Sequence, residues 1–367
     1  MAPMKILSPI KGPADARAVV EAGAGELYCG VLPQAWNKSY TNMASPNRRE
    51  WRSSNMKTFE DVAAVADIAH AGGAQIFLTL NALYTEGQYP QIAGFVTGAM
   101  KTGIDAIIVA DLGLLLALRK MGWTRAIHIS TGGTAFNNET VAFYKSLGAS
   151  RVIIPRHNRV SEIAAIARAN RDIEIETFIM NRGCMNIDGF CTYHHGTSEI
   201  RSPLLWGLPK KLNCDYYLLQ AMKIMPAGLR RKLGRTGIFK SDSACFIPYH
   251  IRVAGGDPAG ARTLKNNLER NFNLFSGFDT CGACAIWDMV RAGVCSLKIV
   301  GRENAIKKKV QDVQFLKICI DHLAVARPDR AAFDAFARGA YQQVFGYACH
   351  NWCYFPAQDR ELTEEEL

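Results

Sequence analysis

The sequence predicts an α/β protein: a (β/α)8 TIM-like barrel with a long insertion after the seventh strand. Short apolar, β-branched runs alternate with helix-periodic segments, an order that is typical of a parallel sheet. Eight such strand–helix units can be counted, which is the number that closes a barrel of this kind. An open, doubly wound sheet is the alternative, but the sequence contains neither a GxGxxG turn nor a sign of a topological switch point.

Each predicted strand is followed by a helix. The strands are expected at Met4–Pro9, Glu26–Cys29, Gln75–Leu80, Ala106–Val109, Ala126–Ile129, Arg151–Ile154, Ile173–Ile179 and Ser296–Val300. The helices are expected at Pro13–Ala22, Thr58–His70, Gln88–Thr102, Leu112–Met121, Asn138–Leu147, Val160–Asn170, Ala285–Ala292 and Glu303–His322. Typical signals mark them: Thr58 and Asp61 form a capping box before an apolar-periodic run, which ends at Gly72. Residues Pro33–Ser54 are polar and are expected to form a long loop.

The alternation stops for about a hundred residues after the seventh strand, far longer than a usual connection between a strand and its helix. We expect a barrel formed by residues 1–179 and 281–322, an insertion over residues 180–280, and a C-terminal helical cap and tail over residues 323–367. The insertion leaves from the carboxyl ends of the strands, where such barrels carry their active sites. It is therefore expected to be a lid, a subdomain or a cofactor holder.

Composition restricts the class of protein. A chain of 367 residues, 49% of them hydrophobic, can bury a large core, and no apolar run is long enough to span a membrane. Residues Met1–Ile10 lack a signal-peptide pattern, so a cytoplasmic location is expected. The cysteine count of 11 is odd, which favours thiols and metal ligands over a disulfide framework.

The net charge of +10 is concentrated in one segment. Residues Arg201–Lys240 contain nine basic residues and a single acid, Asp215, with aromatic residues such as Trp206 among them. This composition suits single-stranded nucleic acid or, less favoured, an anionic membrane surface, while a solvated lid face is the simplest explanation. A small-molecule or RNA substrate is expected, and the sequence is compatible with a homo- or hetero-oligomer.

Six cysteines lie inside or at the edges of the insertion: Cys184, Cys191, Cys214, Cys245, Cys281 and Cys284. Thiolates are the usual protein ligands of zinc and of iron–sulfur clusters. The first pair directly follows a strand and is separated by six residues, which is too wide for a zinc knuckle, whereas clusters accept scattered ligands. An iron–sulfur cluster is therefore favoured, and zinc is the alternative.

The same stretch resembles a known family. Glu176-x-Phe178, Asn-Arg-Gly-Cys184 and Gly-Phe-Cys191 are similar to the signature of the collagenase-like peptidase family U32, which includes the iron–sulfur proteins of ubiquinone, tRNA and ribosomal RNA hydroxylation. Further landmarks, within a similarity that runs from Lys5 to about Leu316, are Gly23–Tyr28, Ala110-Asp111, His128–Thr131, Ile154–Arg156 and Ser296–Arg302.

The resemblance implies a 4Fe–4S cluster held by four cysteines. Cys184 and Cys191 match the first two ligands and Cys245 the third; Cys281 is nearest to the fourth, with Cys284 and Cys214 as rivals. The implied activity is oxygen-independent hydroxylation of an aromatic, nucleobase or lipid-like substrate, with prephenate as a candidate oxygen donor. Two departures from the family pattern are Gly132, where Gln is usual, and the segment Lys298–Arg302, which lacks the usual Glu before its Gly.

Candidate catalytic side chains are His128, Glu176, Arg156 and Arg302. His128 is expected to face the barrel interior, either as a core histidine or as an acid–base group. Glu176 is expected to point inward beneath the cysteines, where a buried carboxylate needs a partner; Arg156 or Arg302 is the expected one. Together with Arg182, these two arginines are expected either to converge as a clamp for carboxylate or phosphate groups or to pair separately with local acids.

Two further functions stay open. The family name suggests a peptidase, and a Cys184–His128 dyad is conceivable, but the sequence has no HExxH helix and no GxSxG elbow. The basic segment, including Arg230, Arg231 and Lys232, suggests an RNA- or partner-binding accessory protein with a structural metal.

Overall fold

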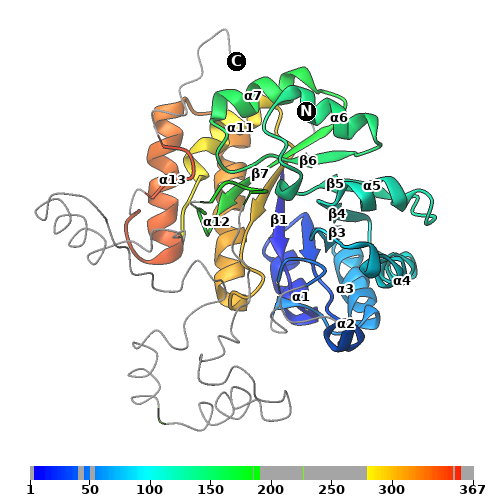
Figure 1. Cartoon of the computed structure of the whole chain (residues 1–367). Helices are drawn as coiled ribbons and strands as arrows, with labels where there is room; N and C mark the ends of the chain where they lie inside the picture. Colours follow the sequence, from blue (N-terminus) through cyan, green and yellow to red (C-terminus); the bar gives the residue numbers. More distant parts are fainter. Residues whose placement is uncertain are drawn as a thin grey trace, which may run out of the picture. The chain divides into compact units, whose positions relative to one another are not determined.

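The computed structural model describes residues 4–39, 45–49, 54–184, 186–190, 226, 279–349 and 352–356. In this part of the chain eight parallel strands form a closed barrel, in which each strand pairs with the next and the last returns to the first (Figure 1). The strands are β1 (Lys5–Pro9), β2 (Glu26–Cys29), β3 (Gln75–Leu80), β4 (Ala106–Val109), β5 (Ala126–Ile129), β6 (Arg151–Ile153), β7 (Glu174–Met180) and β8 (Ser296–Ile299). The predicted fold class is confirmed.

Helices follow the strands along the chain and cover the outside of the barrel (Figure 1). They are α1 (Pro13–Glu21), α2 (Gln34–Ser39), α3 (Phe59–Ala71), α4 (Tyr89–Met100), α5 (Leu112–Leu118), α6 (Asn138–Ser146), α7 (Val160–Ala169), α11 (Ile286–Ala292), α12 (Ile306–Ala326) and α13 (Arg330–Phe345). The last two pack against each other, with the rings of Phe315 and Tyr341 centred 5.5 Å apart.

Local sequence signals begin these helices as expected. Thr58 accepts a hydrogen bond from the backbone N–H of Asp61, and the Asp61 carboxylate accepts one from the backbone of Thr58, so the capping box of α3 is present. The carboxylate of Asp111 likewise accepts from the backbone N–H of Leu114 at 2.7 Å and begins α5.

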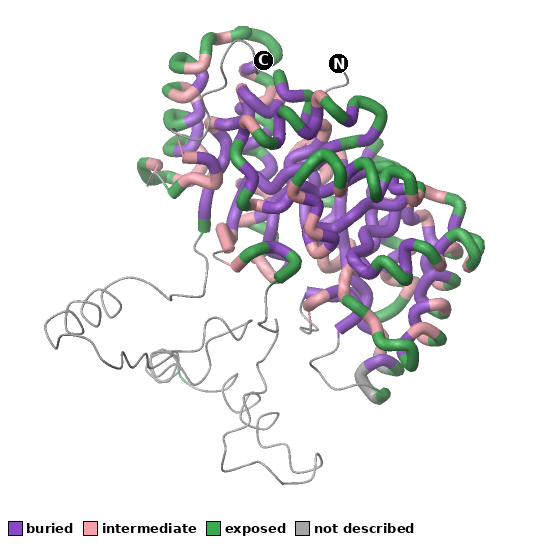
Figure 2. The backbone as a smooth tube through the Cα atoms, turned by 45° about the horizontal axis from the view of Figure 1, so that its top comes forward, coloured by how far each residue is buried: buried purple, intermediate pink, exposed green. Residues whose placement is uncertain are grey.

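The strands are buried on both faces, whereas the helices expose their outer faces (Figure 2). One group of side chains inside the barrel is an apolar cluster that includes Tyr28, Phe77 and Phe178. A second group is charged: the buried Arg151 contacts both Glu26 and Glu176. The interior is therefore a packed core with a built-in ionic network.

The predicted strands agree with the observed ones to within one residue at each end. Three helices differ from prediction, the first being α5, which ends at Leu118 instead of Met121. The expected loop Pro33–Ser54 contains α2, because buried Trp36 packs on Phe95, with ring centroids 5.5 Å apart. The last barrel helix begins later and continues to Ala326, since no glycine or proline ends it before Pro328.

The predicted insertion, residues 180–280, lies outside the described residues except near its two ends and at position 226. Its division from the barrel and the cap therefore stays a prediction. Cys191, Cys214, Cys245 and the basic segment Arg201–Lys240 also lie outside the described residues. No helix in the described ranges is long and apolar enough to cross a bilayer.

Candidate functional site

The end of β7 carries a turn with unusual backbone geometry. Asn181 and Arg182 have φ of 64° and 40°, although neither is glycine. A non-glycine residue in this left-handed region is strained and persists only where its surroundings hold it. Asn181 is held by α12, because its side-chain amide donates to Asp312 at 2.8 Å and its side-chain oxygen accepts from Lys308 at 2.6 Å. This turn leads directly to Cys184.

Tyr354 fixes the same turn from the C-terminal segment. Its hydroxyl donates to the carbonyl oxygens of Asn181 and Arg182, the latter at 2.9 Å, and its ring packs against the apolar cluster inside the barrel. Burial raises the pKa of Tyr354 to about 12, so the hydroxyl remains a donor at neutral pH. Sequence analysis missed this residue, because it belongs to the tail and only the metal-ligand types of Cys349 and Cys353 nearby gave any signal.

Replacing Tyr354 with phenylalanine is expected to lower the free energy of unfolding by about 1–2 kcal/mol, because both carbonyl groups of the turn lose their donor while the ring is kept. Urea unfolding of the two proteins measures the difference. Tyr347→Phe is the matched control, because the hydroxyl it removes makes one long hydrogen bond, accepted from Tyr341 at 3.5 Å, on a half-exposed side chain, so its loss should change stability little. Equal effects of the two changes would contradict a specific role for Tyr354.

Cys184 is half-buried and lies close to Arg156 and Tyr354. The side-chain amide of Asn186 donates to its sulfur at 3.7 Å. Among the described residues, no three His, Cys, Asp or Glu side chains are arranged as metal ligands, and Cys191 and Cys245 lie outside these residues. The predicted ligand set therefore stays a prediction, with Cys184 at the carboxyl ends of the strands.

Two of the three arginines proposed as a clamp are paired with local acids. The guanidinium of Arg156 lies 3.1 Å from the carboxylate of Asp188 and 4.4 Å from the centroid of the Phe178 ring. Arg182 lies 2.8 Å from the carboxylate of Glu303. Burial disfavours the charged form of Arg156, but the negative charge of Asp188 outweighs the effect of burial. The pKa of Arg156 is therefore raised. Of the two expected arrangements, separate pairing describes these two residues.

Arg302 is buried and contacts neutral oxygen atoms. It donates to Asn55 and Thr79 at 3.3 Å and to the backbone and side-chain oxygens of Asn47 at 3.1 and 3.0 Å. Burial, with a further contribution from the charge of Arg49, lowers its pKa to about 10, so it remains charged at neutral pH. Arg302 thereby ties the loop after β2 to the end of β8.

The predicted ionic partner of Glu176, Arg156 or Arg302, was wrong. Neither Arg156 nor Arg302 pairs with it; its carboxylate lies 3.1 Å from Arg151 and 2.9 Å from Lys298. Arg151 reaches across from β6 because the barrel interior collects long side chains from neighbouring strands at one level. Its position two residues before Ile153 on a predicted strand, which places the two side chains on the same face, was the signal that could have identified it.

His128 faces the barrel interior, as expected, and its role as a core histidine or an acid–base group stays a prediction. Its ring packs edge-on against Phe77, with centroids 4.6 Å apart, and it is 3% exposed. Burial lowers its pKa well below the ordinary value, and the charges of Arg151 and Lys298 lower it further, so the ring is neutral at physiological pH. Its Nδ1 is buried and has no hydrogen-bond partner within the described ranges.

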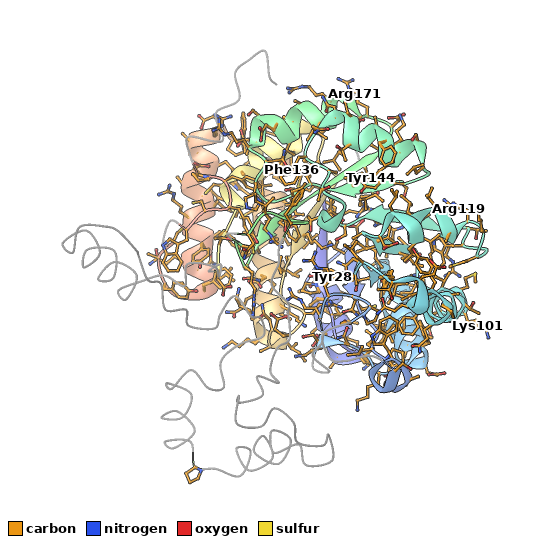
Figure 3. The ribbon with its side chains drawn as sticks, in the orientation of Figure 1. Tyr28, Lys101, Arg119, Phe136, Tyr144 and Arg171 are labelled. Carbon is orange, nitrogen blue, oxygen red and sulfur yellow. The ribbon has the colours of Figure 1, made fainter. Side chains whose placement is uncertain are left out.

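Cys281 and Cys284 are brought close to each other, and the neighbours recorded for them differ from those recorded for Cys184. The electrostatic neighbours of Cys281 are Cys284, Cys319 and Cys349. Those of Cys184 include Arg156 and Tyr354 instead. In Figure 3, Tyr28 lies among the barrel strands, whereas Arg119 and Arg171 lie on the outside of the barrel.

The chain is similar in sequence to several known proteins. The tRNA hydroxylation protein P of Escherichia coli (strain K12) is 31% identical over 269 residues, which cover 71% of this chain and 58% of that protein. The tRNA hydroxylation protein P2 of Bacillus subtilis (strain 168) is 28% identical over 242 residues, 66% of either chain. The 23S rRNA 5-hydroxycytidine C2501 synthase of Escherichia coli (strain K12) is 28% identical over 193 residues, 52% of this chain and 26% of that protein.

The chain thus spans 26–66% of the length of these relatives. Residues 12–203 and 240–363 match the profile of Peptidase family U32, and the resemblance noted in the sequence is confirmed. Because this match covers more than half of the chain, the protein belongs to peptidase family U32.

Proposed function

We propose that the protein is an iron–sulfur enzyme that hydroxylates a nucleobase of RNA without molecular oxygen. The relatives named for tRNA and ribosomal RNA hydroxylation support the reaction and the RNA substrate. The observation that carries the proposal is the position of Cys184, which follows the turn at the end of β7 where barrel enzymes place their chemistry.

The proposed 4Fe–4S cluster is held by Cys184, Cys191, Cys245 and one further cysteine. The chemistry around Cys184 fits a metal-bound thiolate, since an amide N–H donates to its sulfur and a guanidinium group lies nearby. Sequence similarity suggested Cys281 as the fourth ligand. Because Cys281 lies among other thiols, we now favour Cys214, one of its two rivals, for this role.

When bound, the cluster supplies electron-transfer or Lewis-acid chemistry beside the substrate. The chain itself contributes positioning. Phe190 and Leu83 expose 70% and 74% of their surface, and Phe190 directly precedes Cys191, so its ring is available to stack on an unpaired base. Among the described residues, Arg302, which is charged and contacts neutral groups, is the cation that we propose for a carboxylate donor such as prephenate.

Replacing Cys184 with serine is the test of the proposed function. The variant, purified anaerobically, is expected to lose most of its iron and acid-labile sulfide and to leave RNA unhydroxylated in cells that lack the wild-type gene. Mass spectrometry of nucleosides from those cells provides the second measurement. Cys295→Ser is the matched control, because Cys295 donates to the carbonyl of Ile175 at 3.1 Å and lies outside the proposed site.

A wild-type protein without iron, or a Cys184→Ser variant with unchanged iron content, would exclude the proposal. The two alternatives gain no support from the described residues. The described contacts of Cys184 do not include His128, which lies in the barrel interior with its edge on Phe77, so the peptidase dyad is not favoured. The basic residues that suggested an accessory RNA-binding role lie outside the described ranges.

A further inference from the structure

We propose that Cys281, Cys284, Cys349 and Cys353 form a second, structural metal site that binds zinc and fastens the C-terminal segment to the barrel. None of the eight described cysteines forms a disulfide. The proposed site does not depend on the iron–sulfur cluster, because it shares no residue with the ligand set Cys184, Cys191, Cys245 and Cys214.

The backbone places Cys281 and Cys353 side by side. They form a parallel β-bridge, in which the N–H of Cys281 donates to the carbonyl of Trp352 at 3.0 Å and the N–H of Tyr354 donates to the carbonyl of Cys281 at 3.0 Å. Bridged residues lie about 4.8 Å apart and direct their side chains to the same face of the sheet. The two sulfur atoms therefore start within reach of one metal ion.

Both side chains point away from the barrel interior. Thr280 packs against Gly183, and the ring of Tyr354 packs against the interior cluster. Because successive residues of an extended segment face opposite sides, Cys281 and Cys353 face the other side. Cys319 of α12 and Tyr341 of α13 are the electrostatic neighbours found there.

Cys284 and Cys349 complete the set. Cys284 lies in the short 3-10 turn Ala283–Ala285, and the N–H of Ala283 donates to the sulfur of Cys281 at 3.4 Å. A backbone donor to the first sulfur of a Cys-x-x-Cys turn stabilises the thiolate form that a metal requires. Cys349 interacts electrostatically with Cys281, and the two pairs have two and three intervening residues, both within the spacings of zinc sites.

Thiolates gathered at one place favour a cation. Their negative charges repel one another unless a positive ion compensates them. A divalent ion supplies that compensation, and cysteine-only ligands select zinc among the common ones.

The sulfur atoms do not surround a common centre before metal binding: within the described ranges, no three His, Cys, Asp or Glu side chains are arranged as metal ligands. Binding therefore requires rotation of the cysteine side chains about their Cα–Cβ bonds. The backbone needs little change, because the β-bridge and the turn after Cys281 are already formed.

The role of such a site follows from what the C-terminal segment carries. Cys353 directly precedes Tyr354, whose hydroxyl holds the turn before Cys184. A metal ion bound to Cys353 and to Cys281, a neighbour of β7, would fix Tyr354 in place from outside the barrel. The zinc would thus support the geometry of the functional site without touching a substrate.

The experiment measures zinc and iron together in the purified full chain. About one zinc ion per chain is expected in the wild-type protein. It should be lost in Cys281→Ser and Cys353→Ser and retained in Cys184→Ser and in Cys319→Ser, a matched thiol change on α12. Replacement of zinc by Co²⁺ should give sulfur-to-cobalt charge-transfer absorption in the wild-type protein and none in Cys353→Ser.

Alkylation provides a measurement that needs no variant. Zinc added to the metal-stripped wild-type chain should protect Cys281, Cys284, Cys349 and Cys353 from iodoacetamide, as identified by peptide mass spectrometry, and leave Cys295 unprotected. Three results would each overturn the proposal. Cys353→Ser could retain zinc, the wild-type chain could neither retain zinc nor gain thiol protection from it, or iron could be found in place of zinc at these residues. Because the iron content of Cys184→Ser tests the cluster separately, failure of one site is distinguishable from failure of the other.

Discussion

Replacing Arg151 with methionine is expected to lower the free energy of unfolding by about 3–5 kcal/mol. Arg151 is 1% exposed and donates two hydrogen bonds to Glu26, at 2.8 and 2.7 Å, and one to Glu176 at 3.1 Å. Methionine preserves much of the volume but leaves buried Glu26 without its main cation and leaves Glu176 with Lys298 alone. The loss is measured by chemical denaturation at neutral pH, with Arg171→Met on the outer surface as the control.

The same change should alter the pH dependence of stability. Burial disfavours the charged form of Glu26, but the hydrogen bonds and charge of Arg151 outweigh it, so its pKa in the folded chain lies below the ordinary value of 4.5. Its contribution to stability is therefore fully present above pH 4.5 and is lost as the pH falls through the lower folded value. The deficit of Arg151→Met should be larger at pH 7 than at pH 4. A deficit that does not depend on pH would indicate that lost packing, and not the ionic network, is its cause.

Replacing Gly30 with alanine is expected to destabilise the protein by about 3 kcal/mol, at the upper end for an overpacked core. A Cβ atom at this position would lie 1.9 Å from a terminal nitrogen of Arg302 and 2.5 Å from the side-chain oxygen of Asn55. Neither group can move freely, because Arg302 is buried and bonded to three side chains. The change should therefore also displace Arg302 from the end of β8.

Gly94→Ala is the control for this prediction. Gly94 lies within α4, where an added Cβ would meet no atom within 4 Å. Alanine is a better helix former than glycine, so this change should raise stability by about 0.5–1 kcal/mol. Thermal unfolding of both variants measures two effects of opposite sign, and destabilisation by both would contradict the steric explanation.

Local pattern was sufficient to place the barrel strands. Each strand is a short apolar run bounded by a turn or a capped helix, and neither signal depends on distant residues. The helix α2 was missed because its only support is tertiary: Trp36 is buried against Phe95, a residue of α4.

The ionic partners could not be predicted in the same way. Arg151 and Glu26 are separated by 125 positions and meet only because the barrel closes. Their positions just after predicted strands identified Arg156 and Arg302 as candidates, but these positions carried no information about which acids the side chains reach. The inward direction of Glu176 and His128 was predictable because it follows from strand alternation alone.

The turn at Asn181 and Arg182 has a consequence for biosynthesis. Its backbone is held by α12 and by Tyr354, so the segment that presents Cys184 acquires its final shape only after residue 354 has left the ribosome. Tyr354 follows Arg182 by 172 positions, and the turn lacks this anchor while those residues are being synthesised. Any metal centre built on Cys184 is therefore expected to assemble after residue 354 has emerged, so maturation factors should encounter a closed barrel instead of a partial one.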